Sequence, residues 1–364
     1  MLAYNVEFWA RDWSFVGSRL ITQHENKEDY LSPVNNSITI KSLPGIEVGG
    51  FLRVWCNDVN CKGIITGTED GSIKGTTTVT YKPYVLLLKQ PVLFDCTMQG
   101  SGYSLEQYIA DVITAKMINN PDTLQNVSGL SVEVETNTTA WTLGLKPISE
   151  ENTKAIVKDF YSAVVVPAMQ NYQIAIRAVT DYQNHTIVLK VGRNTAPMKT
   201  IELDLKNIKN KKIVIQQTNN SKNKLVVYNQ SDDFETLVVY YLHTDGTYDT
   251  TDADRITPVD EELRTTTVKE GETLEDKAAQ VAANVFNSIK YNNLIEFEVK
   301  ASDELIKPDT LQIGQTVRIL ADGKEYYSIL TGRKTGETVR LIFGTIRLEL
   351  TKRIGRSLQN GGSY

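Results

Sequence analysis

The sequence predicts an α+β protein that is dominated by antiparallel β-sheet, with β-rich blocks at both ends of the chain. Apolar residues alternate with polar ones along many short segments, for example at 201–205, 295–299 and 339–343. A period of two is typical of strands that have one buried and one solvated face. Between such segments lie Asp-Gly pairs, which supply the positive φ of type I′ hairpin turns; they are Asp70-Gly71, Asp245-Gly246 and Asp322-Gly323.

The alternation also places the individual strands, which are rich in the Thr, Val, Ile and Tyr residues that half-buried pleated surfaces favour. The expected strands are Asn5–Trp9, Ser37–Ile40, Gly50–Cys56, Gly63–Thr68, Thr76–Tyr81, Ala175–Val179, Thr186–Val191, Ile201–Leu205, Lys212–Gln216, Leu225–Tyr228, Thr236–His243, Leu294–Lys300 and Val339–Phe343.

The first expected helix runs from Leu105 to Met117. Ser104 and Gln107 have the spacing of a capping box, and apolar residues recur with helical spacing after them. Asn120-Pro121 should end this helix, because a residue before proline disfavours the α conformation.

Two further helices are expected. One spans Ser149–Val165 and should break before Pro167, since proline interrupts a helix interior. The other spans Thr273–Lys290, with Glu275 and Asp276 placed favourably in its first turn.

Composition excludes several protein classes. The chain has 364 residues, enough for about two or three structural units that fold without disulfides or metals. Its 41% hydrophobic and 23% charged residues exclude collagen-like, disordered and disulfide-rich proteins, and a net charge of −5 argues against non-specific nucleic-acid binding. No apolar run approaches about 18 residues, and Met1–Trp13 lacks the pattern of a signal peptide. We therefore expect a soluble protein with no membrane span, synthesised in a cytoplasm.

Cys56 and Cys61 are separated by four residues, and Cys96 is the third cysteine. The two neighbouring thiols could pair, or could hold a metal if further ligands came from elsewhere. Zinc sites usually show a second Cys or His pair, which this sequence lacks. We therefore favour free thiols beside a hairpin in a reducing compartment.

The histidines do not form a recognisable catalytic motif. His24 lies among charged residues and is expected to be solvated, whereas His185 and His243 lie in or beside strands. The sequence contains none of the metalloprotease, nucleophile-elbow, P-loop or dinucleotide-binding patterns.

The best metal candidate is an acidic cluster between 243 and 255. Calcium prefers several oxygen ligands at close spacing, but this segment lacks the EF-hand pattern and its bidentate Glu. A solvated turn is the favoured interpretation, and calcium is the alternative. The cluster consists of Asp245, Asp249, Asp252 and Asp254.

Paired carboxylates for glycoside hydrolysis are the remaining enzymatic option. The candidate carboxylates fall in segments that look like exposed loops, and no Trp-rich cleft surrounds them. We therefore predict no catalytic residue, no cofactor site, no metal site and no enzymatic activity. The carboxylates are Asp232, Asp233, Glu235, Asp260, Glu261 and Glu262, and the four tryptophans, Trp9, Trp13, Trp55 and Trp141, are expected to be core or interface residues.

The C-terminal third carries a recognisable order of elements. The strand Leu294–Lys300 is followed by Leu311–Ile319, by a hairpin on Asp322-Gly323 and by a last strand that begins at Val339. This order resembles the closing barrel of phage tail hub proteins, the tail-associated or baseplate-hub family of siphophages related to the hub of contractile tails. The first strand block is similar to the opening barrel of that family, and the Tyr-rich run Leu237–Leu242 fits its middle portion.

The resemblance implies two small tail-tube-like β-barrels with intervening α/β lobes, in a ring-forming homotrimer without a hydrolase extension. It implies a structural hub at the tail tip that links the hexameric distal tail protein to receptor-binding or spike proteins and gates the DNA channel. The tape-measure protein would be a further partner, DNA would pass only in transit, and the protein would be made in the host cytoplasm for the virion. A β-rich carbohydrate-binding or glycan-degrading protein is the alternative.

The resemblance places four side chains on or near barrel faces: Tyr326, Tyr327, Arg318 and Arg340. The alternative is that they are ordinary side chains of a hairpin. The basic segment Arg347–Arg356 would either dock on a partner or be solvated.

The resemblance also divides the chain into five parts. The parts are 1–98, a β-barrel-like domain; 99–170, a helical lobe; 171–293, a β-rich middle domain ending in a helix; 294–345, the C-terminal barrel strands; and 346–364, a basic tail.

Overall fold

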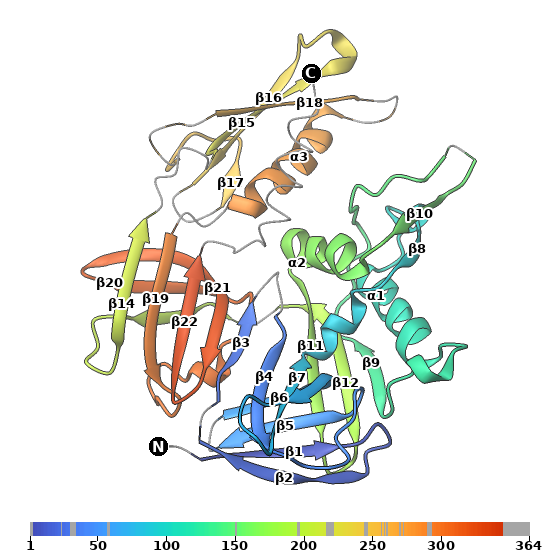
Figure 1. The fold of residues 1–364 in the computed structure, drawn as a ribbon. Helices are drawn as coiled ribbons and strands as arrows, with labels where there is room; N and C mark the ends of the chain where they lie inside the picture. Colours follow the sequence, from blue (N-terminus) through green and yellow to red (C-terminus); the bar gives the residue numbers. More distant parts are fainter. Residues whose placement is uncertain are drawn as a thin grey trace. The chain divides into compact units, whose positions relative to one another are not determined.

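The computed structural model confirms a β-dominated α+β fold (Figure 1). It describes residues 3–22, 24–29, 34–56, 59–149, 151–194, 197–215, 222–243, 247–255, 257, 259, 261–268, 271, 273–289 and 293–344.

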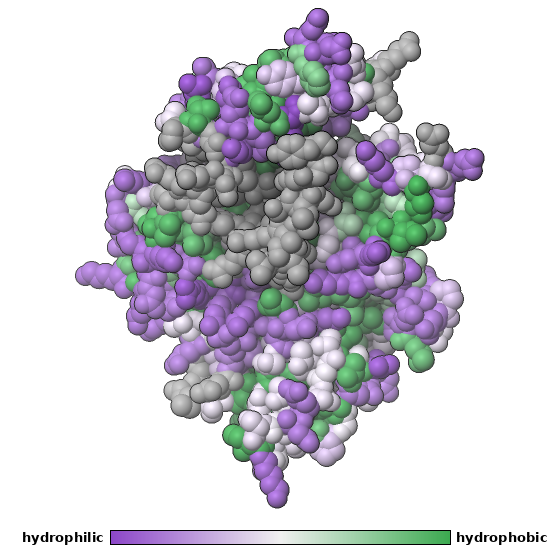
Figure 2. All heavy atoms as spheres, turned by 45° about the horizontal axis from the view of Figure 1, so that its top comes forward, coloured by the Kyte–Doolittle hydropathy of each residue, from purple (hydrophilic) through white to green (hydrophobic). Residues whose placement is uncertain are grey.

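The chain forms two compact units. Unit 1 contains residues 1–196, 299–314 and 332–340, and unit 2 contains residues 197–298, 315–331 and 341–364. The five-part division stays a prediction, because compactness does not show which segments fold alone. On the face shown in Figure 2, hydrophobic side chains reach the surface in small groups between hydrophilic ones.

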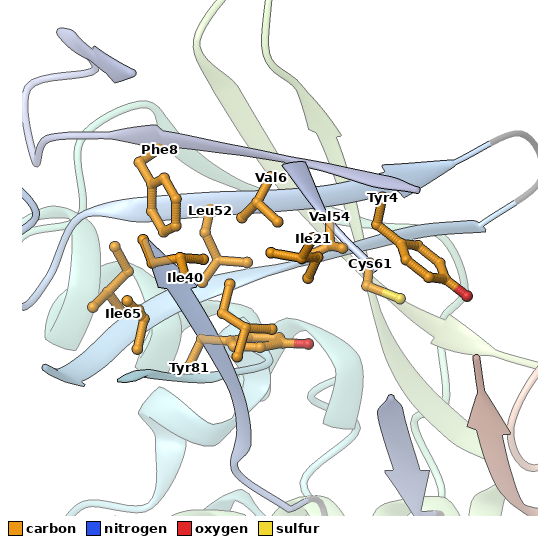
Figure 3. Packing of buried hydrophobic residues seen from close by; sticks show 12 residues of the cluster. Tyr4, Val6, Phe8, Ile21, Ile40, Leu52, Val54, Cys61, Ile65 and Tyr81 are labelled. Atoms are coloured by element: carbon orange, nitrogen blue, oxygen red, sulfur yellow. The ribbon is translucent and has the colours of Figure 1, made fainter. Parts of the chain in front are cut away.

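The first sheet of unit 1 is antiparallel, with the strand order β2-β1-β5-β6-β7-β4. Its inner face carries alternate residues of each strand, and Figure 3 shows Phe8, Leu52 and Ile65 among the side chains that point toward one another. The edge strands β2 and β4 are joined by Arg19, which donates to the carbonyls of Lys41 (3.1 Å) and Ser42 (2.9 Å), so the sheet is strongly curled. Its strands are β1 Tyr4–Trp9, β2 Phe15–Ile21, β4 Asn36–Lys41, β5 Phe51–Cys56, β6 Val59–Asp70 and β7 Thr76–Lys82.

Two smaller sheets complete the β-structure of the N-terminal segment. One has the order β11-β12-β9, in which β9 runs parallel to β12, and the other pairs β8 with β10. Aromatic residues pack between the curled sheet and β11–β12. The rings of Trp13 and Phe51 are stacked with their centres 4.1 Å apart, and the ring centres of Tyr182 and Trp9 are 4.5 Å apart. The bounds are β8 Val92–Asp95, β9 Leu130–Val134, β10 Lys154–Val157, β11 Ile174–Asp181 and β12 Thr186–Arg193.

The short strand β3 (Asn26–Asp29) also belongs to unit 1. It pairs antiparallel with residues 332–335, the last residues of β21 (Lys324–Thr335). The sequence did not predict β3, because its four polar and charged residues show no alternation of apolar side chains.

The helix α1 (Leu105–Ile113) is the first predicted helix, and a π-helical turn extends it to Ile118. The hydroxyl of Ser104 accepts a hydrogen bond from the Gln107 amide at 3.3 Å, as the capping box requires. The reciprocal half of the box is wrong, since the Gln107 side chain donates to Asp111 one turn further on (2.8 Å).

The second predicted helix is wrong. Residues 154–157 form β10, where Ala155 and Val157 are buried and their neighbours are exposed, which is the period of a strand. A π-helical turn follows at Tyr161–Val165, and α2 (Val166–Tyr172) then runs through Pro167 instead of stopping before it. The π-helical turn directly before Pro167 already departs from the α-helical hydrogen-bond pattern, so the amide hydrogen that proline lacks interrupts no regular α-helical ladder there.

The main sheet of unit 2 has the strand order β13-β20-β21-β22-β19-β14. Asp322 (φ 51°) and Gly323 (φ 70°) form the predicted tight turn between β20 and β21. Asp70-Gly71 does not form a tight turn, because residues 71–75 form a longer loop between β6 and β7. Asp245-Gly246 lies outside the described residues. The remaining bounds are β13 Lys199–Glu202, β14 Lys209–Ile215, β19 Asn293–Lys300, β20 Thr316–Ala321 and β22 Thr338–Gly344.

Unit 2 also contains a four-stranded sheet with the order β17-β16-β15-β18 and the predicted third helix, α3 (Leu274–Ile289). Ala278, Ala282 and Phe286 of α3 pack against one face of this sheet. Parallel pairs occur at β9–β12, β13–β20 and β15–β18, so the sheets are not uniformly antiparallel. The strands are β15 Lys224–Asn229, β16 Leu237–Leu242, β17 Tyr248–Asp249 and β18 Glu261–Thr266.

Gly129 directly precedes β9 and lies beside the Trp13 ring and the backbone carbonyl of His185. Its φ is +72°, and a Cβ there would lie 2.1 Å from the carbonyl oxygen of His185. We expect Gly129→Ala to lower the free energy of unfolding by about 2 kcal/mol more than Gly75→Ala. Gly75 is the matched control, because its φ is +81° but a Cβ would meet nothing within 4 Å. Urea denaturation measures both losses, and equal losses would contradict the proposed steric conflict.

Candidate functional site

The described part of unit 1 contains a cavity of about 760 Å³. Its walls come from β3, β6, β11 and the segment Pro308–Ile313. Apolar side chains form much of its lining; they include Tyr84, Val85, Tyr161, Met169, Ile176 and Leu189. Its volume is in the range of about 300–1,000 Å³ that is usual for ligand pockets.

Arg333 lines this cavity and joins three distant segments of unit 1. Its guanidinium forms an ion pair with Glu28 of β3 and donates to the carbonyls of Pro308 (3.1 Å) and Leu311 (3.0 Å). Burial opposes the charge on Arg333, but the Glu28 carboxylate outweighs this effect and raises the pKa of the guanidinium. The group therefore stays charged and positions the wall of the cavity.

Lys62 of β6 also lines the cavity and lies opposite Arg53 of β5 in the strand register. Burial, and secondarily the charge of Arg53, lower the pKa of the Lys62 ammonium. Two cations therefore lie side by side on one face of the sheet, an arrangement that is unfavourable without an anion.

The cysteines occupy the predicted hairpin. Cys56 ends β5 and Cys61 lies in β6, both with free thiols. Burial, with a smaller effect from Glu28, raises the pKa of Cys61 to about 12, so its thiol is neutral and unreactive at pH 7.

The histidines differ in their surroundings. His24 is not solvated as expected: it is only 9% exposed, packs 5.5 Å from the ring of Tyr4, and burial lowers its pKa to about 4. The neighbouring Glu25 and Lys27 form an ion pair, at 3.2 Å. His185 stacks on Trp13 in the turn before β12, and the Nε2 of His243 lies 3.1 Å from an Asp249 oxygen.

The acidic candidates are not brought together. Asp249 accepts hydrogen bonds from the amide (2.7 Å) and hydroxyl (2.6 Å) of Thr251, which lower the pKa of its carboxyl. Asp252 and Asp254 are exposed, and Asp245 lies outside the described residues. Within the ranges that the structure describes, no group of three or more His, Cys, Asp or Glu side chains could hold a metal.

The carboxylates considered for glycoside hydrolysis have other partners. Asp232 accepts from the Thr236 hydroxyl, while Glu261 pairs with Lys224 and Glu262 with Arg264. Asp260 lies outside the described residues, and Asp233 and Glu235 are exposed.

Three of the four tryptophans are core residues as predicted. Trp9, Trp13 and Trp141 are buried, whereas Trp55 is 36% exposed with the Arg53 guanidinium 5.3 Å from its ring centre. Of the residues expected on barrel faces, Arg318 forms an ion pair with Glu325 across the β20–β21 hairpin (2.9 Å). The basic segment Arg347–Arg356 lies outside the described residues.

Sequence reasoning missed the buried carboxylate of Glu106 on α1. Its oxygens accept from the hydroxyls of Thr136 and Thr138, both at 2.7 Å, and from the Thr138 amide at 2.7 Å. The signal that would have found it is spacing, because Glu106 lies on the same helical stripe as Ile109 and Ile113. Lys62 and the Glu28–Arg333 pair offered no such signal, since their partners are distant in sequence.

No helix in the described segments has the length and apolar character that a membrane crossing requires. No protein-family model matches the sequence, and no curated protein matches it.

The fold is similar to solved structures of phage tail proteins. The tail protein from Neisseria meningitidis MC58 gives a TM-score of 0.54 at 15% identity, over 94% of this chain and 96% of that chain. The 43 kDa tail protein of prophage MuSo2 from Shewanella oneidensis gives 0.54 at 13% identity, over 93% and 98%. Prophage tail protein gp18 from Listeria monocytogenes EGD-e gives 0.50 at 8% identity, over 98% of both chains.

These matches run along almost the whole length of each chain, so the similarity includes the order of elements from the first strand to the last. Identities this low relate folds and do not assign residues. The chain therefore has the fold of phage tail proteins, which confirms at the level of the fold its resemblance to the tail hub family.

Proposed function

We propose that this protein is a structural hub at the distal tip of a phage tail. It would link the hexameric distal tail protein to trimeric or receptor-binding tip components and close or gate the DNA channel. The observation that carries this proposal is the similarity to tail proteins over 94% of this chain and 96% of the Neisseria protein. A chain that consists of this fold almost throughout is best explained by a role in the tail itself.

The sheets support the proposed ring of three subunits with two tube-like barrels each. In unit 1, Arg19 joins β2 to β4 and curls the six-stranded sheet toward closure. In unit 2, the sheet that contains β19–β22 is the candidate for the second barrel. Strands with one wet face could line a lumen, and a symmetric ring pairs edges that would otherwise be exposed.

The side-chain chemistry also favours a structural role. The carboxylates considered for catalysis are exposed or paired with hydroxyl or cationic groups, as described above. The distal tail protein, receptor-binding or spike proteins and the tape-measure protein are the proposed partners. DNA would pass through the lumen only in transit, and the virion tail tip is the proposed location.

Light scattering of the purified full-length protein at micromolar concentration tests this proposal. We expect a mass of about three times 40.8 kDa, followed by rings with a central hole in electron micrographs. Because some rings assemble only on their neighbours, a monomer would next be titrated with the distal tail protein. A monomer that forms no complex with that protein, or that binds or cleaves cell-wall glycan, would overturn the hub and favour the carbohydrate-binding alternative.

A further inference from the structure

Lys62 is the cation in the unit 1 cavity for which the described residues provide no ion-pair partner. It lies opposite Arg53 in the β5–β6 register, and Arg53 already has its own partners. The Arg53 guanidinium lies 4.0 Å from a Glu7 oxygen and 3.2 Å from the Asn60 side-chain oxygen, and it covers the rings of Trp55 and Tyr182. Glu7 therefore pairs with Arg53, and the positive charge of the Lys62 ammonium has no carboxylate partner among the described residues.

The other cations of the cavity are paired. Arg333 pairs with Glu28, Arg177 with Glu135, and Lys27 with Glu25. Two further carboxylates, Asp29 and Asp309, line the cavity. Asp29 has a partner of its own, and the charge of Asp309 helps to raise the pKa of Arg333. Among the described cations that line the cavity, Lys62 is thus the one without a carboxylate partner.

The remaining walls are suited to an apolar ligand body. Tyr84, Val85 and Tyr161 line the cavity together with Met169 and Leu189. A ligand that filled this space would replace water on apolar surface, and a carboxylate on it would provide the missing counter-charge.

We propose that the unit 1 cavity binds a small amphipathic carboxylate, with its alkyl or aryl body against the apolar walls and its carboxylate on the Lys62 ammonium. The cavity volume of about 760 Å³ accommodates such a molecule. The lowered pKa of Lys62 agrees with this assignment, because an anion would restore the charged form. This inference does not depend on the hub function proposed above.

Isothermal titration of the full-length protein with dodecanoate, below its micelle concentration at pH 7, tests the site. We expect Lys62→Met to weaken dodecanoate binding at least about 10-fold, because a charge-assisted hydrogen bond is lost. Neutral dodecanol should bind wild type and Lys62→Met equally. The matched control is Lys82→Met: Lys82 lies on the neighbouring strand β7, burial lowers its pKa as well, and it does not line the cavity.

Thermal unfolding of both variants separates binding from folding. Lys62→Met removes an uncompensated cation and should not lower the melting temperature. Three results would each overturn the proposal: no binding of dodecanoate to wild type, equal binding by wild type and Lys62→Met, or an equal loss in Lys82→Met.

Discussion

Glu106→Gln is expected to lower the free energy of unfolding by about 3–5 kcal/mol at pH 7. The Glu106 side chain is fully buried on α1, and its carboxylate accepts hydrogen bonds from Thr136, Thr138 and Ser104. A glutamine amide replaces one acceptor oxygen by a donor, which would face other donors in a buried place. Arg193 bonds to the same two threonines, so the loss would extend to the end of β12.

The pH dependence of stability provides a second measure of this carboxylate. Burial alone would raise the pKa of Glu106, but the hydrogen bonds from Thr136 and Thr138 outweigh it and hold the pKa below the usual 4.5. A carboxyl with a depressed folded-state pKa stabilises the protein above its unfolded-state pKa. That stabilising contribution is lost as the pH falls through the pKa of the carboxyl in the folded state.

Urea denaturation at pH 7 and in steps below pH 4.5 measures both effects. The difference between wild type and Glu106→Gln should shrink as the pH falls. Glu69→Gln is the control, because Glu69 is exposed on β6, and it should change stability by less than about 0.5 kcal/mol. A Glu106→Gln loss that is small at pH 7, or that does not change with pH, would contradict the role assigned to the carboxylate.

Arg333→Met is expected to lower the free energy of unfolding by about 3–5 kcal/mol. The substitution breaks the ion pair with Glu28 and leaves the carbonyls of Pro308 and Leu311 without their donor. Only 17% of the Arg333 side chain is exposed, so water cannot replace these contacts fully. The pairing of β3 with residues 332–335 should weaken with it, because Glu28 and Arg333 face each other in that register.

The neighbouring Lys334 provides the matched control. Its ion-pair partner Glu25 directly precedes β3, and both side chains are more than 40% exposed. Lys334→Met should therefore cost only about 0–1 kcal/mol. Hydrogen exchange of the β3 amides measures the local effect, and denaturation measures the global one. Similar losses in the two variants would mean that Arg333 acts only as a surface charge.

Periodicity predicted the strands and helices that bury one regular face. The alternation in β1, β4 and β19 and the helical spacing in α1 and α3 each mark such a face, whatever the element packs against. Ser104 and the Asp322-Gly323 turn were predicted for a similar reason: capping and positive φ are settled by a few adjacent residues.

Elements that depend on distant partners escaped prediction. β3 consists of four polar or charged residues and is a strand because residues 332–335 provide its hydrogen bonds. The error at Ser149–Val165 has the same origin, since β10 is specified by β8 about 60 residues earlier in the chain. The parallel pairs β9–β12, β13–β20 and β15–β18 likewise join strands that are not neighbours in sequence.

The sequence by itself determined the β-dominated class, the first and third helices and the order of elements that resembles tail hub proteins, because local spacing encodes each of them. Only the tertiary structure decided the burial of His24, the anchoring by Glu106, the Glu28–Arg333 pair and the position of Lys62 in a cavity. Burial and charge compensation depend on which side chains meet in space, and the residues that meet here come from segments up to about 300 positions apart.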